Sequence, residues 1–243
     1  MADRSKGEGQ SYQAFVLPEG LKGLVAAPYA DDLVSGWFSP GFWGDNAQAV
    51  DSGGRGAAWF IRHHPRDWVL RHYLRGGLMA RFSRTRYVYA GPTMVRSIAE
   101  FRILADLHQR GFPVPRPVAA SYRRTGLFYE AAIILERLEN VVPFAGFISN
   151  GDSDLWYQVG ATIRMFHDAG VFHADLNCFN ILVGGGQVYL IDFDKAVFKD
   201  GNRDDWKQSN LSRLKRSLVK LGGLDSDRAL SALWETLMLG YRA

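Results

Sequence analysis

The sequence is short of cysteine and of long apolar runs. Cys178 is the only cysteine among 243 residues, so an internal disulfide is excluded, and no group of cysteines and histidines has zinc-site spacing. No apolar run reaches the roughly 18 residues that a membrane-spanning helix needs. Met1–Gln10 is polar and lacks the apolar segment of a signal peptide. We therefore expect a protein of a reducing, cytosolic compartment that neither spans a membrane nor is secreted by that route.

Charge of one sign is not in large excess either, because the formal net charge is only +4. Hydrophobic residues make up 47% and charged residues 22%, which is typical of a globular chain that forms one compact unit or two small lobes. The basic residues nevertheless crowd between positions 62 and 96. They are Arg62, Arg66, Arg71, Arg75, Arg81, Arg84, Arg86 and Arg96, with His63, His64 and His72. Such a stretch suits nucleic acid, ATP phosphates or an anionic membrane, and charge alone does not choose among them.

The most informative pattern lies between Val171 and Phe198. His173, Asp175 and Asn180 have the H-x-D-L-x-x-x-N spacing of a kinase catalytic loop, and Asp192 opens an I-D-F-D segment where kinases have a metal-binding Asp-Phe-Gly. Phosphoryl transfer needs a carboxylate beside the acceptor hydroxyl and hard oxygen ligands for Mg²⁺. The pattern predicts that Asp175 orients or accepts the hydroxyl proton and that Asn180 and Asp192 bind Mg²⁺. The alternative for His173 is a buried core histidine.

Two apolar segments separate these residues and predict a short hairpin. Residues 181–183 and 188–191 are joined by three consecutive glycines, and we expect this hairpin to hold Asn180 and Asp192 at opposite ends while joining the two loops into one site. Asp194 stands where the kinase motif has glycine and adds a carboxylate near the metal. Cys178 lies in the catalytic loop without a matching base, so we interpret it as a small packing residue.

The first half of the chain carries the predicted nucleotide site. Gly53, Gly54 and Gly56 form a glycine-rich turn between two strands of a meander, where backbone amides can approach phosphates closely. The next strand, W-V-L-R, places Arg71 where protein kinases have a lysine, so Arg71 is predicted to contact the phosphates. Arg75 is the alternative if the register differs.

A helix over 97–110 and a buried strand over 127–138 follow. Glu100, early in the helix, is predicted to pair with the strand cation; the alternative is an exposed glutamate. Glu136 and Leu138 fall where a hinge between lobes would lie, and their backbone groups are predicted to meet the adenine edge.

The predicted fold is α+β, a two-lobed protein-kinase-like fold with a small β-rich N-lobe at 47–138 and a compact helical C-lobe at 139–243. Residues 1–46 are predicted to be an extension whose aromatic side chains pack on the small lobe or anchor in a membrane interface. Helices are expected over 152–169, 206–221 and 225–241. Little length remains for the peptide-docking part of a protein kinase, which favours a small-molecule or lipid-linked hydroxyl as the acceptor.

Several segments together resemble one family. They are G-R-G-A-A-W-F at 54–60, W-V-L-R-H-Y-L-R-G-G at 68–77, E-F-R-I-L-A-D-L-H at 100–108, G-F-P-V-P-R-P-V at 111–118, H-A-D-L-N-C-F-N-I-L at 173–182 and L-I-D-F-D-K at 190–195. Through them the chain resembles the 3-deoxy-D-manno-octulosonic acid (Kdo) kinases of lipopolysaccharide inner-core assembly.

The resemblance implies ATP-dependent phosphorylation of the 4-hydroxyl of Kdo on a lipid A precursor. It also implies a peripheral protein on the cytoplasmic face of a Gram-negative inner membrane, with an anionic glycolipid rather than nucleic acid as partner. Two alternatives stay open. One is a kinase of the same fold that acts on core heptose or on a soluble small molecule, and the other is a non-catalytic module that binds lipopolysaccharide precursors.

Overall fold

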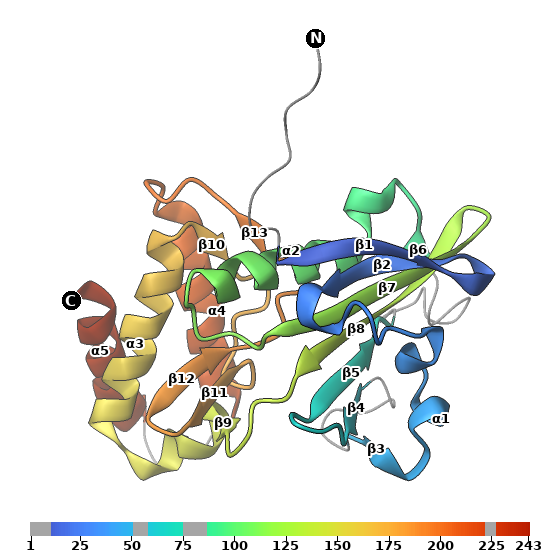
Figure 1. Ribbon diagram of the computed structural model, residues 1–243. Helices are drawn as coiled ribbons and strands as arrows, with labels where there is room; N and C mark the ends of the chain where they lie inside the picture. The colour runs from blue at the N-terminus through green and yellow to red at the C-terminus, as the bar shows by residue number, and fades with distance from the viewer. Residues whose placement is uncertain (1–10, 51–57, 75–86, 222–226) are drawn as a thin grey trace. The chain divides into compact units, whose positions relative to one another are not determined.

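The computed structural model describes residues 11–50, 58–74, 87–221 and 227–243. Contacts divide the chain into two compact units (Figure 1). Unit 1 comprises Met1–Ala105 with Arg116–Arg137, and unit 2 comprises Asp106–Pro115 with Leu138–Ala243. The N-lobe was predicted to end at residue 138, and unit 1 ends one residue earlier, at Arg137. Residues 106–115 also lay within the predicted N-lobe, but the structure assigns them to unit 2.

Unit 1 is built on a sheet that has eight antiparallel strands within the described residues. The strand order is β1-β2-β7-β8-β5-β4-β3. β6 pairs with the first residues of β8, Phe128 and Tyr129, which β5 does not reach. The strands are β1 (Tyr12–Leu17), β2 (Leu21–Ala26), β3 (Ala47–Ala49), β4 (Ala58–Ile61), β5 (Trp68–His72), β6 (Tyr87–Val88), β7 (Pro117–Thr125) and β8 (Phe128–Glu136). In the described residues of this region the α-helices are α1 (Pro40–Trp43) and α2 (Arg96–Gln109).

The first two strands change the interpretation of the predicted N-terminal extension. β1 and β2 form a hairpin, and β2 pairs with β7 from Leu21↔Arg123 to Val25↔Ala119. The segment after the hairpin buries Trp37 and Phe38 in the same hydrophobic core as Trp68 and Leu70. Part of 1–46 therefore belongs to the sheet and its core, because β-pairing with a distant strand satisfies its backbone groups.

The predicted meander is present as β3, β4 and β5, with β4 pairing β5 in the register Ala58↔Arg71 to Ile61↔Trp68. Alternation along a strand sends successive side chains to opposite faces. Trp68 and Leu70 are buried in the core that contains Trp37, so Arg71 lies on the other face of the sheet, where its side chain contacts α2.

Unit 2 consists of helices with small strand pairs. Its elements are β9 (Val142–Pro143), α3 (Ser153–Asp168), β10 (Val171–Phe172), β11 (Ile181–Gly184), β12 (Gln187–Leu190), β13 (Val197–Phe198), α4 (Asp205–Leu221) and α5 (Asp227–Arg242). The predicted helices are confirmed to within two residues at their ends. Asp152 caps α3, because its carboxylate accepts a hydrogen bond from the Leu155 N–H at 3.1 Å.

Helices α3 and α5 pack with their backbones close together, and two glycines make this possible. A Cβ on Gly160 would lie 1.9 Å from the Leu237 carbonyl oxygen, and one on Gly240 would lie 2.0 Å from the Tyr157 carbonyl oxygen. A larger residue at either position would push the helices apart. Among the described residues, no helix combines the length and apolar composition that crossing a membrane requires.

Candidate active site

His173 is the buried centre of the predicted catalytic loop, which connects β10 to β11. Its Nε2–H donates to the Ile191 carbonyl oxygen at 2.9 Å, and its Nδ1 accepts from the Asp175 N–H at 3.2 Å. This pair of bonds requires the neutral ring with the proton on Nε2. Burial also lowers the pKa of His173, which favours that neutral form. His173 is thus a buried histidine that also ties Asp175 to the segment preceding Asp192.

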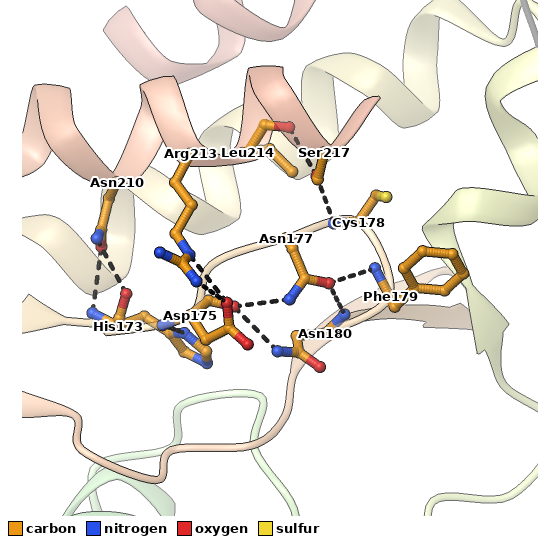
Figure 2. Close-up of polar contacts among 10 residues, drawn as sticks. All are labelled: His173, Asp175, Asn177, Cys178, Phe179, Asn180, Asn210, Arg213, Leu214 and Ser217. Carbon is orange, nitrogen blue, oxygen red and sulfur yellow. Dashed lines mark hydrogen bonds and ion pairs between the residues drawn. The ribbon is translucent and has the colours of Figure 1, made fainter. Parts of the chain in front are cut away.

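Amide side chains hold the loop around Asp175, as Figure 2 shows. The Asp175 carbonyl oxygen accepts from Asn177 Nδ2 at 3.0 Å and from Asn180 Nδ2 at 2.9 Å. Asn177 Oδ1 in turn accepts from the N–H groups of Phe179 and Asn180. The loop is therefore rigid through its own hydrogen bonds, while the Asp175 side chain remains 48% exposed. A carboxylate held in this way is available to a hydroxyl group outside the loop.

The predicted hairpin is present, but the predicted placement of its flanking residues is wrong. β11 pairs antiparallel with β12 from Ile181↔Leu190 to Gly184↔Gln187. Asn180 precedes β11 and Asp192 follows β12, so both lie at the open end of the hairpin. The Ile191 N–H donates to the Asn180 carbonyl oxygen at 3.0 Å and closes that end. An antiparallel hairpin necessarily brings its two outer ends together.

Asn180 and Asp192 carry oxygen atoms of the kind that a divalent cation prefers. Because Asn180 Nδ2 donates to the Asp175 carbonyl oxygen, the Asn180 Oδ1 atom is directed elsewhere and is available as a ligand. Asp192 has φ of 63°, a left-handed conformation that aspartate tolerates better than most residues. Mg²⁺ is typically held by one or two protein oxygens together with phosphate and water. The described residues contain no cluster of three or more acidic, histidine or cysteine side chains that could hold a metal ion.

Arg213 on α4 contacts Asp175 directly. Its Nε and Nη2 atoms donate to Asp175 Oδ1 at 2.8 Å and 2.5 Å, and the Arg213 side chain is 49% exposed. In the sequence Arg213 is one of several cations on a predicted helix, and no local signal connects it with the motif. The two residues are 38 positions apart, so only the packing of α4 on unit 2 creates this contact.

Asn210 on α4 is a second residue that the motif does not reveal. It is buried, donates from Nδ2 to the His173 carbonyl oxygen at 2.9 Å, and accepts from the His173 N–H at 3.1 Å. His167 Nε2 also donates to Asn210 Oδ1 at 3.4 Å, and His167 Nδ1 accepts from the Tyr241 hydroxyl at 2.8 Å. This network connects α3, α4 and α5 to the start of the catalytic loop.

Burial of His167 predicts a loss of stability in acid. Desolvation lowers its pKa to about 4 from an ordinary 6.5. The unfolded chain therefore binds more protons, so this stabilisation is complete above pH 6.5 and disappears as the pH falls towards 4. We expect the difference in unfolding free energy between wild type and His167→Gln to shrink by about 3 kcal/mol across that range. Urea denaturation at several pH values measures it, and parallel pH dependences of the two proteins would contradict the prediction.

Unit 1 contains Glu100, the residue predicted to pair with Arg71 of β5. Glu100 on α2 is fully buried, and its Oε2 atom accepts from both the Arg71 guanidinium and the Tyr73 hydroxyl. Burial, with the nearby Glu100 charge, raises the pKa of Tyr73 well above its ordinary value, so the hydroxyl stays protonated. The predicted pairing of Arg71 with Glu100 is thus confirmed, whereas contact of Arg71 with phosphates stays a prediction.

The predicted hinge has fewer available backbone groups than we expected. The Glu136 N–H donates to the Arg116 carbonyl oxygen and the Arg137 N–H to that of Asp67, both at 2.8 Å. The Glu136 carboxylate accepts from the Tyr29 hydroxyl at 2.6 Å. These N–H groups are therefore engaged within unit 1, because β8 continues its pairing to Glu136. Leu138 begins unit 2.

The remaining residues of the sequence analysis are the glycine-rich turn, Arg75 and Cys178. Gly53, Gly54, Gly56 and Arg75 lie outside the described residues. Cys178 is fully buried, and burial raises the pKa of its thiol. A buried thiol with a raised pKa is a poor nucleophile, which agrees with its interpretation as a packing residue.

Residues 41–241 match the model of the lipopolysaccharide kinase (Kdo/WaaP) family. The chain belongs to this family. It is 48% identical over 207 residues to the 3-deoxy-D-manno-octulosonic acid kinase of Xanthomonas oryzae pv. oryzae. The aligned residues cover 84% of this chain and 82% of the relative. The protein of the same name from Stenotrophomonas maltophilia is 48% identical over 190 residues, covering 77% and 76%. The chain is therefore a kinase rather than a non-catalytic module.

Solved structures confirm the predicted kinase-like fold. An amicoumacin kinase in complex with AMP-PNP, Ca²⁺ and amicoumacin superimposes with a TM-score of 0.61 at 12% identity, covering 82% of this chain and 72% of that one. WaaP in complex with acyl carrier protein gives a TM-score of 0.52 at 15% identity, covering 80% of each chain. At these identities the likeness concerns the fold alone.

Proposed function

We propose that this lipopolysaccharide kinase transfers the γ-phosphoryl group of ATP to the 4-hydroxyl of Kdo on a lipid A precursor during core assembly. The observation that carries the proposal is the half-exposed Asp175 carboxylate on a rigid loop, with Asn180 and Asp192 together at the adjoining hairpin end. The relatives that bear the name Kdo kinase support the choice of acceptor, because they are about half identical over most of the chain.

Asp175 accepts the hydrogen bond of the acceptor hydroxyl and orients its oxygen. That oxygen forms a bond to the γ-phosphorus while the bond from the γ-phosphorus to the β,γ-bridging oxygen breaks, and ADP leaves. The hydroxyl proton passes to Asp175. Asn177 and Asn180 keep the Asp175 main chain in place during this step, so little reorganisation is required.

ATP and Mg²⁺ are the cofactors in this proposal. Arg71 contributes positive charge to the phosphates and keeps its orientation through Glu100. Asn180 Oδ1 and the Asp192 carboxylate would hold the metal ion. When bound, Mg²⁺ supplies positive charge against the phosphate oxygens.

Replacement of Asp192 with asparagine should reduce the dependence of ATP affinity on Mg²⁺. Asparagine keeps the shape and tolerates the left-handed backbone at φ of 63°, so the change removes charge rather than structure. We expect affinity for ATP with Mg²⁺ to fall at least about tenfold, a loss that even outer-shell partners of a metal cause. Calorimetry across a Mg²⁺ titration measures it. Asp200→Asn, an exposed change in the same unit, is the control, and equal affinities for the two variants would contradict the assignment.

Transfer of labelled γ-phosphate tests the reaction itself. The acceptors are a Kdo-bearing lipid A precursor and its heptosylated form, each with wild type and with Asp175→Ala. Label on the Kdo-only acceptor that disappears in the variant supports the proposal, and mass spectrometry with NMR of the product identifies the phosphorylated hydroxyl. Label on the heptosylated acceptor alone would move the acceptor to core heptose.

The proposed location is the cytoplasmic face of the inner membrane, where the enzyme is a peripheral protein. An anionic glycolipid acceptor in the bilayer and the net charge of +4 support this location. Recovery of the enzyme in the membrane fraction at low salt, and its release at high salt, is the expected result, since surface electrostatic attraction is screened by salt.

A further inference from the structure

The contact between Arg213 and Asp175 leaves part of the guanidinium group available (Figure 2). Arginine presents five N–H donors in a planar fork. Asp175 Oδ1 occupies the side formed by Nε and Nη2. Within the described part of the chain, the edge formed by Nη1 and Nη2 has no other partner. Two parallel N–H groups on that edge match the two oxygens of a carboxylate.

Stability does not explain why a cation should stand beside Asp175. Ion pairs between side chains as exposed as these contribute little to folding. The shape of the loop depends instead on Asn177, Asn180 and His173, which bond to the Asp175 backbone. A cation at this position is useful if it binds an anionic group of the acceptor.

We propose that Arg213 binds the carboxylate of the acceptor sugar while Asp175 binds the hydroxyl that is phosphorylated. The inference rests on the proposed function, since an octulosonic acid carries its carboxylate and its 4-hydroxyl on the same small ring. One side of the Arg213 guanidinium group contacts Asp175. Its outer edge binds the carboxylate of the substrate. Arg213 is therefore a specificity-determining residue, because a heptose offers ring hydroxyls but no carboxylate.

Steady-state kinetics with two acceptors tests this role. One acceptor is the Kdo-bearing lipid A precursor, and the other is the same molecule with its Kdo carboxylate converted to the methyl ester. We expect Arg213→Gln to raise KM for the acid by about tenfold to a hundredfold, the scale of a lost charge-assisted hydrogen bond. KM for the ester should change little, because the wild type already lacks the bond to it. Where turnover of the ester is too slow, calorimetric Kd values replace KM.

Two further variants make the test specific. Lys215→Gln removes the same charge from the same helix, but Lys215 lies over the Trp234 ring, so both acceptors should behave as with wild type. Arg213→Lys keeps the charge without the fork and should recover part of the affinity for the acid. Arg213 is half-exposed, so all three variants should unfold at wild-type temperatures.

Two outcomes would overturn the inference while the proposed function stands. Equal losses in kcat on both acceptors would make Arg213 a positioning residue for Asp175, and unchanged constants on both would make the contact a surface ion pair. Failure of the wild type to phosphorylate the Kdo-bearing precursor is a different result, which overturns the proposed function and this inference together.

Discussion

Replacing Asp175 with alanine should lower kcat on the Kdo-bearing acceptor by roughly a hundredfold or more, the usual scale for loss of a positioned base. The affinity for ATP with Mg²⁺ should change little, because Asn180 and Asp192 remain. The backbone of residue 175 keeps its bonds to Asn177 and Asn180, which use the carbonyl oxygen rather than the carboxylate. The variant should therefore fold normally, and rate measurements at saturating acceptor give the result.

Asp168→Ala is the matched control for this experiment. Asp168 is another exposed carboxylate of unit 2 that is paired with an arginine, since Arg164 Nε lies 2.7 Å from its Oδ1 atom. Its loss should leave kcat within about twofold of wild type, because an exposed pair of this kind contributes little to stability. Comparable rates for Asp175→Ala and Asp168→Ala would remove Asp175 from the catalytic step.

The Glu100→Gln variant should lose about 3–5 kcal/mol of stability, the cost of removing one member of a buried ion pair. Glu100 is fully buried and serves both Arg71 and Tyr73 through one oxygen. The substitution keeps the shape of the side chain but removes the Glu100 charge beside Arg71, which is 23% exposed. We expect a lower urea midpoint and a weaker affinity for ATP, because the Arg71 side chain loses its orientation.

Glu19→Gln is the corresponding control on the surface of unit 1. Glu19 Oε2 lies 3.0 Å from Arg123 Nη2, with side chains 77% and 43% exposed, and removal of its charge should cost less than about 1 kcal/mol. Urea denaturation followed by circular dichroism compares the two variants. Equal midpoints would show that burial of Glu100 adds nothing to the strength of its pairing.

Much of the candidate site could be predicted because its residues are close in the sequence. The spacing from His173 to Asn180 lies within one loop, and the glycines at 184–186 announce a turn between two apolar segments. The pairing of Arg71 with Glu100 was predictable only by comparison with a known kinase pattern. The relative position of Asn180 and Asp192 was mispredicted, because the antiparallel register of β11 and β12 brings both residues to the same end of the hairpin.

The sequence by itself determined the catalytic motif, the helices, the meander of β3 to β5 and the hairpin of β11 and β12, because these depend on local periodicity, capping and turn residues. Only the tertiary structure decided that β1 and β2 join the sheet and that Asn210 and Arg213 reach the catalytic loop. These contacts join residues far apart in the chain, and each depends on the packing of whole elements that no short pattern records. For this reason the tertiary structure was needed to place a cation beside Asp175, and with it the inferred contact to the acceptor carboxylate.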